Sequence, residues 1–569
     1  MLSGKLKSLP SVLLAAVIII QVFYLFRMGT QEKKEYHCDE VYSYGLANGF
    51  YQPFIESGNI RSFDFHYVDE WVSGEVYRNY LTVQENQRFR YDSVWYNQSQ
   101  DRHPPLFYAV LHTVCSFFPD TFSPWFGMIP NLIYFAVTQY FLYRLSKNVL
   151  KSRYLALLVI LFFGFTPAAV NNTLFIRMYC MLVMWGVIFM YLHSRLAYVQ
   201  KENFFRDFLP ITVITALGAL TQYVFLFMAF ATAVCFCFWY LLRKKYKIFW
   251  IYGLSMLSGV LMMFAVFPAS IQHLFTEGSG VGRGLDEQLV IAVRYLFFNV
   301  FCMNRSNLVW LLCFLPPMVG ILTAMALPVL FLFRDRLKGT KAKINAKWNR
   351  MKKGFHRKPF ASLKESIKSH PEMIAMIAML ASVVTVMVIV SYTVSFMGKF
   401  ADRYFFIICP FAAVLILGGL YWLLSKVRFS RILAGLLTLL LSVNVMARSS
   451  LLSAWTYENT MDLHDTLSDG NVIFVLKSPD EYSILSTLSY ELYHAENVFV
   501  TNFQEKYSRI EKTQELVSDK PFYLVLPSEY FDMGFDGYIR HHLLNHSRLL
   551  GEYHFMQGEF FVYQLYPVT

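Results

Sequence analysis

The chain is poor in charge and has no cysteine framework, and each shortage excludes a class of protein. Only 16% of its 569 residues are charged, whereas 56% are hydrophobic and 18% are aromatic. A soluble globular chain of this length does not carry so little charge among so much apolar sequence. The eight cysteines are scattered, and none follows residue 448. This spacing excludes a disulfide-stapled domain and repeats no metal-ligand motif.

Three further features are missing. The first apolar run ends in Phe-Arg-Met-Gly-Thr, without the small-residue cleavage site of a signal peptide. The Gly-x-Gly spacing at 278–284 follows no strand, so it is not a nucleotide motif. The net charge of +12 comes from short connections between apolar runs, which argues against nucleic acid as a partner. No half of the chain repeats the other.

Long apolar runs are what the sequence has in abundance. Runs of about 18 or more apolar residues mark transmembrane helices, and here they predict eleven spans. Lys5 and Lys7 precede the first span, and bases recur in alternate connections, so we expect a cytoplasmic N-terminus. The predicted spans are 9–28, 125–143, 154–170, 178–194, 208–221, 223–242, 247–268, 307–333, 371–396, 404–424 and 430–447.

The connections between the spans differ in character. The first loop, residues 29–124, is acidic and aromatic, and we expect it outside the membrane with interfacial helices. Its apolar stretch 106–118 is too short to span. The helical periodicity at 285–303 predicts a second interfacial helix. The basic loop 334–370 is predicted to be cytoplasmic, either as a contact with anionic membrane lipids or as a solvated topology anchor.

After residue 448 the pattern changes to short strands and helices. We expect strands at 471–477, 498–501, 522–526 and 560–566, with a helix at 480–493. The predicted fold is therefore a mainly α, polytopic membrane protein with a small C-terminal α/β domain outside the membrane. Residues 1–447 form the membrane domain and residues 448–569 the second domain.

Charged side chains gather on the predicted outer face. Asp39-Glu40 follows the first span, and Arg102-His103 precedes the apolar stretch 106–118. Arg177, Lys399 and Arg403-Tyr404 lie at other outer helix ends. Ionisable groups at a membrane boundary are costly, so they indicate a site, although solvated acids and interfacial anchors would give the same pattern. A carboxylate with several cations suits transfer from a phosphate leaving group to a hydroxyl or amine.

These motifs resemble a known family. Asp39-Glu40 after the first span, followed by His103-Pro104-Pro105-Leu106-Phe107-Tyr108, resembles the C-type superfamily of integral-membrane glycosyltransferases. The protein mannosyltransferase branch (glycosyltransferase family 39) is the most similar, with its bacterial relatives that include the lipid A aminoarabinose transferases. Arg177-Met178-Tyr179 and Arg403-Tyr404 also lie where such proteins often carry an Arg-Tyr pair. The resemblance covers residues 1–440.

The resemblance implies inverting transfer of a sugar from a polyprenyl-phosphate donor. Asp39 would activate the acceptor, with Glu40 as its neighbour. The residues implied near the donor phosphate are Arg102, His103, Arg177, Lys399, Arg403 and Tyr404. Some relatives carry a lysine where this chain has His103. Some more distant ones use a divalent metal, and the sequence leaves such a metal open because no second acidic motif is clear.

The sequence leaves the acceptor and two alternative functions open. The acceptor is a cell-wall polymer, a glycolipid or a protein, and the expected location is a bacterial plasma membrane. The alternative function is a transporter or flippase for a lipid-linked saccharide. Such proteins place ionisable groups at the bilayer midplane and often contain repeats, unlike this chain. A scaffold without activity is the third alternative.

Overall fold

The structure is a computed structural model, and it divides into two compact units, residues 1–32 with 129–454 and residues 33–128 with 455–569. We call them the helical unit and the mixed unit. The predicted span 307–333, the basic loop 334–370 apart from its last residue, the glycine run 278–284 and Lys399 lie outside the described residues. The described residues are 2–31, 33, 36–55, 68–275, 285–301, 370–393, 401–424, 430–449, 461–478, 481–482, 484–502, 512–528, 544–555 and 558–566.

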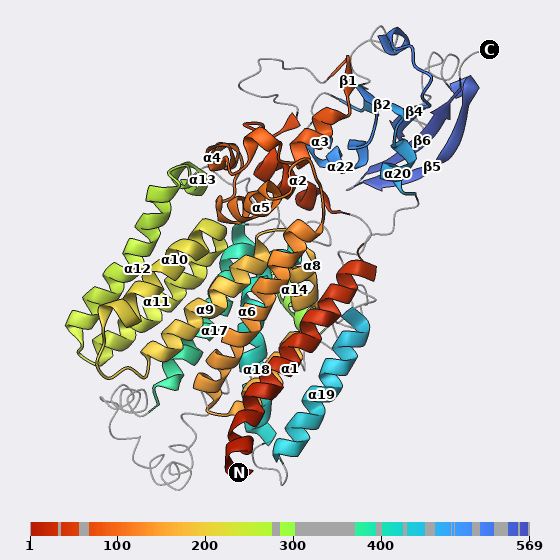
Figure 1. Cartoon of the computed structure of the whole chain (residues 1–569). Helices are drawn as coiled ribbons and strands as arrows, with labels where there is room; N and C mark the ends of the chain where they lie inside the picture. The colour runs from red at the N-terminus through yellow and green to blue at the C-terminus, as the bar shows by residue number, and fades with distance from the viewer. Residues whose placement is uncertain are drawn as a thin grey trace, which may run out of the picture. The chain divides into compact units, whose positions relative to one another are not determined.

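The helical unit is built from helices that coincide with the predicted spans (Figure 1). Two short helices of other types, η3 (Phe204–Phe208) and η5 (Ala401–Ile408), lead into α10 and α18. The α-helices are α1 (Leu2–Gln31), α6 (Trp125–Leu150, apart from its first turn), α7 (Arg153–Phe163), α8 (Pro167–Leu174), α9 (Tyr179–Leu196), α10 (Leu209–Thr221), α11 (Val224–Leu242), α12 (Tyr246–Val266), α13 (Ser270–Phe275), α14 (Leu285–Phe301), α17 (Glu372–Thr393), α18 (Cys409–Leu424) and α19 (Ser430–Ser449).

The chain is a multi-pass membrane protein, but the predicted number of spans is not confirmed. Within the described residues, 7 helices are long and apolar enough to cross a membrane, or 8 if α7 and α8 form one span. Helices α6 and α19 lie at predicted spans, with 26 and 20 residues, but are not among the seven. Polar residues in the middle of α6, such as Asn131 and Gln139, reduce its apolar character.

A polar network stabilises the break between α7 and α8, which are bent by 58°. The amide of Gln21 on α1 donates to the carbonyl of Ile160 at 2.9 Å, and the amide of Gln139 donates to Gln21 Oε1 at 2.8 Å. Gly164 lies at the break, where a Cβ would come within 2.2 Å of Gln21 and 2.4 Å of Gln139. The glutamines bond a carbonyl near the break that would otherwise face an apolar environment.

The mixed unit combines the first loop with the C-terminal region. From the first loop come α2 (Cys38–Asn48), β1 (Trp71–Ser73), α3 (Glu75–Leu81), η2 (Glu85–Gln87), α4 (Tyr91–Gln100) and α5 (Leu106–Ser116). From the C-terminal region come α20 (Leu463–Leu467), β2 (Asn471–Leu476), α21 (Ile484–Thr487), α22 (Ser489–Leu492), β3 (Asn497–Asn502), β4 (Phe522–Pro527), η9 (Leu544–His546), β5 (Ser547–Phe555) and β6 (Gly558–Leu565).

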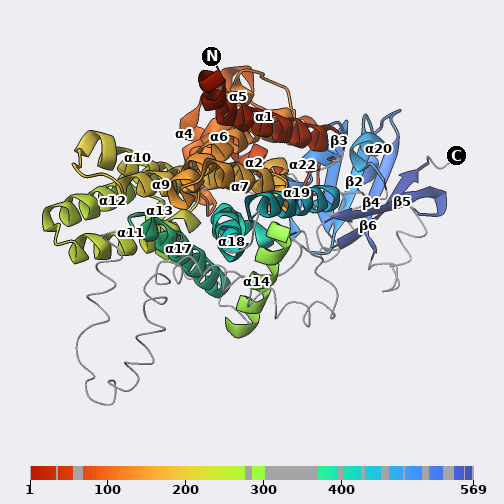
Figure 2. The ribbon, with the colours of Figure 1, turned by 90° about the horizontal axis from the view of Figure 1, so that it is seen from below.

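These strands form one sheet of six, in the order β1-β3-β2-β4-β6-β5 (Figure 2). The central strand β2 is parallel to β3 and β4, while the outer strands pair antiparallel. The sheet's core consists of Ile473, Val475, Phe499, Leu524, Leu526 and Tyr563. At one edge, Trp71 of β1 pairs with Phe499 of β3, so a strand from the first loop completes the C-terminal sheet.

The four predicted C-terminal strands are present, but the region differs from the prediction in two ways. The expected helix at 480–493 is two short helices, α21 and α22. The expected strands lacked β5, which is largely exposed and carries little apolar alternation. The sequence analysis also grouped the first loop with the membrane helices, whereas its contacts place it in one unit with the C-terminal sheet. Helix α5, with 11 residues or about 16 Å, is too short to span.

The β1–β3 pairing depends on a glycine, and its replacement tests this arrangement. A Cβ on Gly74 would lie 1.9 Å from the carbonyl oxygen of Ala495, although its backbone is α-helical and would accept alanine. We expect Gly74→Ala to lower the free energy of unfolding by about 1–3 kcal/mol through overpacking. Thermal unfolding of the purified protein in detergent measures this.

The matched control is Gly253→Ala, because no atom lies within 4 Å of a Cβ at Gly253. It should leave the melting temperature unchanged or raise it slightly. Equal melting temperatures for Gly74→Ala and the wild type would contradict the close approach at Ala495.

Candidate functional site

The acidic motif Asp39-Glu40 lies in the first turn of α2, which is closed by a capping box. His37 precedes the helix, and its Nδ1 accepts a hydrogen bond from the Asp39 amide at 3.1 Å. In return, the Glu40 carboxylate accepts the amide of His37 at 2.9 Å. The sequence His-Cys-Asp-Glu thus supplies the cap and the third-position acid that such a helix start requires. Both carboxylates also lie at the positive end of the helix dipole.

Glu40 is committed to a buried ion pair. The Lys33 ammonium lies 2.7 Å from both oxygens of the Glu40 carboxylate. The two side chains are 3% and 0% exposed, respectively. With its two oxygens shared between Lys33 and the His37 amide, Glu40 fixes the segment ahead of α2. Nothing in the spacing from residue 33 to residue 40 predicts the contact between Lys33 and Glu40.

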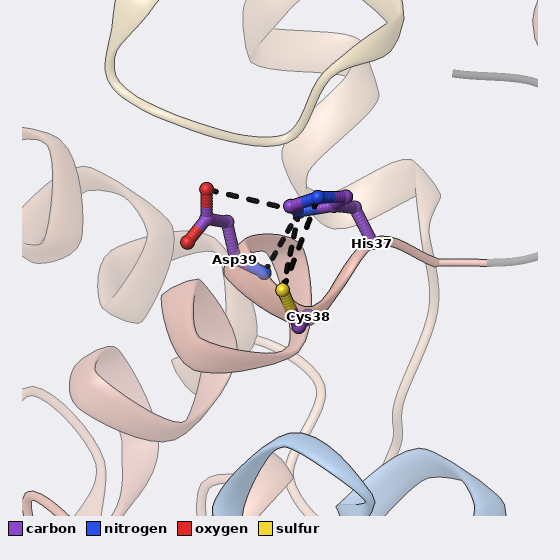
Figure 3. Close-up of side chains that lie close together, drawn as sticks. All are labelled: His37, Cys38 and Asp39. Atoms are coloured by element: carbon purple, nitrogen blue, oxygen red, sulfur yellow. Dashed lines mark hydrogen bonds and ion pairs between the residues drawn. The ribbon is translucent and has the colours of Figure 1, made fainter. Parts of the chain in front are cut away.

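Asp39 is the more accessible carboxylate of the pair. Its side chain is 17% exposed, and Oδ2 lies 3.7 Å from Nδ1 of His37 (Figure 3). Figure 3 shows the carboxylate and the imidazole side by side at the start of the helix. A carboxylate that reaches solvent while its backbone is held by a cap is suited to accept a proton from a bound group.

The same residues are the one group of potential metal ligands found among the described residues. His37, Cys38 and Asp39 each offer a ligand atom, and these atoms all lie within 4.8 Å of one another. Nitrogen, sulfur and carboxylate ligands together suit zinc or a similar transition metal. However, Nδ1 of His37 already accepts the helix-capping bond, so metal binding through it would break the cap. The divalent metal that the sequence left open therefore stays a proposal.

Aromatic rings from the C-terminal region pack beside this helix start. Tyr36 lies 4.6 Å from Tyr490 and 5.4 Å from Phe122, measured between ring centroids. His464 stacks on Tyr490 at 4.4 Å. Burial raises the pKa of Tyr36 well above its ordinary value, and the neighbouring Tyr490 and Glu40 raise it further. The residue ahead of the acidic motif is therefore held as a neutral ring by the C-terminal part of the mixed unit.

The basic motif Arg102-His103 lies in the turn between α4 and α5. Arg102 is exposed, whereas His103 is partly buried and its Nδ1 lies 2.7 Å from Oδ2 of Asp101. Asp101 therefore orients His103, a partner that the sequence analysis did not single out. Helices α2, α4 and α5 pack against one another in the mixed unit, so both motifs of the first loop belong to one helix group.

The two Arg-Tyr motifs meet in the helical unit. Arg177, 5% exposed, lies between α8 and α9. Arg403 lies on η5, with its guanidinium 5.3 Å from the ring centroid of Tyr404. The rings of Tyr404 and Tyr179 are in edge contact at 5.9 Å, which joins the motifs. Asn131 donates to the carbonyls of Thr173 and Phe175 at 3.1 and 2.9 Å and so fixes the segment before Arg177. Lys399 lies outside the described residues.

Comparison with known proteins gives structural similarity alone. No family model and no curated protein match the chain. The solved structure of ArnT from Cupriavidus metallidurans in the apo state is similar, with 13% identity, 97% of each chain covered and a TM-score of 0.45. The same protein bound to undecaprenyl phosphate gives 13% identity, 98% of each chain and a TM-score of 0.44.

An oligosaccharyltransferase from Archaeoglobus fulgidus, tethered with an acceptor peptide, is also similar. It has 13% identity and a TM-score of 0.45, over 91% of this chain and 69% of its own. These proteins are C-type glycosyltransferases, the superfamily that the sequence resembles. Because these TM-scores are below 0.5, we argue the activity and the site of this chain from its own residues.

Replacing Glu40 tests its role in the stability of the mixed unit. Glu40→Gln leaves the Lys33 ammonium buried without its counter-charge, so we expect a loss of about 3 kcal/mol or more in the free energy of unfolding. Combining it with Lys33→Met should recover part of that loss, since no buried charge then remains. Chemical unfolding in detergent compares the single and the double variant with the wild type.

The exposed pair Glu75 and Arg78, with side chains 66% and 40% exposed, is the control. Glu75→Gln should change the stability little, because surface ion pairs contribute little. If Glu40→Gln were as stable as Glu75→Gln, the structural role of Glu40 would be rejected.

A buried histidine on α5 predicts acid sensitivity of the mixed unit. His112 is 2% exposed, and burial lowers its pKa from 6.5 to about 4, against smaller opposing effects of the Ala47 backbone and Asp92. As the pH falls from about 6.5 to about 4, His112 binds a proton in the unfolded chain but not in the folded one. The free energy of unfolding therefore decreases by about 3 kcal/mol over this range. His112→Leu should remove this part of the acid loss.

Unfolding measured between pH 8 and pH 4 tests this, with the difference between His112→Leu and the wild type at pH 8 as the reference. An identical pH dependence for the two proteins would contradict a buried neutral His112.

Proposed function

We propose that this protein is a membrane glycosyltransferase that moves a sugar from a polyprenyl-phosphate donor to an acceptor. The division of roles between the two neighbouring carboxylates is the observation that carries this proposal. Glu40 is neutralised by Lys33, whereas Asp39 is 17% exposed on a capped helix. Glu40 stabilises the start of α2, and Asp39, which reaches solvent, accepts the proton in the reaction.

The reaction follows from these groups. Asp39 accepts the proton of an acceptor hydroxyl or amine, whose oxygen or nitrogen attacks the anomeric carbon of the sugar. The bond from that carbon to the phosphate oxygen breaks, and polyprenyl phosphate leaves with the electron pair. A single displacement of this kind inverts the configuration. Arg177 and Arg403 in the helical unit bind the phosphate and stabilise its developing charge, with Tyr404 beside them.

The remaining donor contacts follow the sequence resemblance. It assigns Arg102 and His103, the latter oriented by Asp101, to the donor phosphate, with Lys399 as a further candidate. The proposed acceptor is a cell-wall polymer, a glycolipid or a protein. The site and the C-terminal sheet face the outside of a bacterial plasma membrane, and the N-terminus is cytoplasmic, as the positive charges of the inner connections favour.

Replacing the proposed base tests the function directly. The purified protein is incubated with radiolabelled polyprenyl-phosphate sugars and crude membrane acceptors, and label transfer is followed. We expect Asp39→Asn to lower the transfer rate by about 10²–10⁴-fold, the usual contribution of a general base. Its melting temperature should stay near that of the wild type, because the capping bonds use the backbone of Asp39 and the side chains of His37 and Glu40.

Glu75→Gln, at an exposed carboxylate of the same loop, should transfer label at the wild-type rate. Full activity of Asp39→Asn would reject Asp39 as the base. Uptake of the intact labelled lipid across a vesicle membrane by both proteins, without transfer, would instead support the flippase alternative.

A further inference from the structure

Helix α14 turns a polar stripe toward the interior of the helical unit. Gln288, Ala292, Tyr295 and Asn299 follow at intervals of four, three and four residues, which places them on one face. All four are buried, whereas Val290 on the opposite side is 51% exposed. The helix packs against α8, α17, α18 and η5, and Figure 2 shows it beside α17 and α18. A face that packs inside a membrane protein is ordinarily apolar or fully hydrogen-bonded.

The two amides of this stripe, Gln288 and Asn299, are polar and are not hydrogen-bonded in the described part of the chain. Among the described residues, both polar atoms of Gln288 and both of Asn299 are buried and have no hydrogen-bond partner. The neighbouring helices contribute further atoms of this kind, Oδ1 of Asn172 on α8 and Oγ of Ser391 on α17. Fewer than about one in ten buried polar groups lacks a partner. Several such groups on helices that share contacts with α14 therefore indicate a polar ligand.

The stripe also indicates what kind of ligand this is. Gln288 and Asn299 are about 16 Å apart along the helix, since each residue adds about 1.5 Å. An extended polar group matches this length better than a single water molecule. Each carboxamide offers donors and an acceptor together, which pairs with neighbouring hydroxyls. Arg403 lies on η5, and Arg177 lies between α8 and α9. Both α8 and η5 contact α14, so the two arginines provide positive charge for an attached phosphate.

We propose that Gln288 and Asn299 bind hydroxyl groups of different sugar units in the saccharide on the lipid donor and thereby select which saccharide is transferred. This inference rests on the proposed function and adds its specificity-determining residues. Asn172 and Ser391 supply further hydrogen bonds to the same polar headgroup. Tyr295, between the two amides, presents an aromatic ring to the stripe.

Binding measurements on the full-length protein in nanodiscs test this inference. The probes are undecaprenyl phosphate and its derivatives that carry one, two and three hexose units. We expect the wild type to bind one sugar-linked lipid about tenfold or more tightly than bare undecaprenyl phosphate. In Gln288→Met and Asn299→Leu this preference should fall to about that of bare lipid, with the affinity for undecaprenyl phosphate unchanged. Val290→Ala, on the exposed side of α14, should keep the preference.

Stability separates recognition from a structural role. An unpaired buried amide destabilises the ligand-free protein, so both apolar variants should melt at the same temperature as the wild type or higher. Lower melting temperatures with an intact preference would mean that water or unrecognised contacts satisfy the amides, and would overturn the inference.

The outcomes also distinguish the two proposals. If the wild type binds undecaprenyl phosphate and gains nothing from any sugar, the role of α14 is rejected and the donor-lipid proposal stands. If the wild type binds none of the four lipids, the proposed function itself fails.

Discussion

A polar group inside this protein must find a partner, and that constraint organises the described structure. In the helical unit, Gln21 and Gln139 bond a carbonyl near the break between α7 and α8. In the mixed unit, Lys33 neutralises the buried carboxylate of Glu40. In both cases the hydrogen bonds hold a structural element in place, the break between α7 and α8 or the segment before α2. Gln288 and Asn299 are among the buried side chains of the described residues whose polar atoms lack a partner, and the cost of two unpaired amides on one helix face is the basis of the proposal for α14.

The same constraint distinguishes the two neighbouring acids. A carboxylate held by a buried lysine and a backbone amide has little capacity left for chemistry, which describes Glu40. Asp39 follows the cap with its backbone fixed and its side chain toward solvent. The two adjacent carboxylates therefore differ in their burial and in their partners. The aromatic contacts of Tyr36 with Tyr490 and Phe122 extend this rigidity to the C-terminal region.

The helices of the membrane domain could be predicted from the sequence because hydropathy is averaged over neighbouring residues. Each predicted span in the described part of the chain coincides with a helix, but the number that cross the membrane depends on polar residues such as Gln139 within α6. Strand β1 was not predictable, because three residues carry no pattern and the partner strand is distant in sequence. Asp39 and Glu40 were identified as a pair. Their different environments depend on the contact between Lys33 and Glu40, which no local spacing predicts.

The pairing of β1 with β3 has a consequence for the order of events during synthesis. The ribosome makes the first loop early, but the strand that completes its edge emerges only after the last predicted span. The loop that carries Asp39 therefore keeps β1 unpaired until β3 has been translated. A chain that is cut short before residue 497 lacks β3 and cannot close this sheet. The first loop, which carries the proposed base, therefore reaches its described packing only after residues 497–502 have been made.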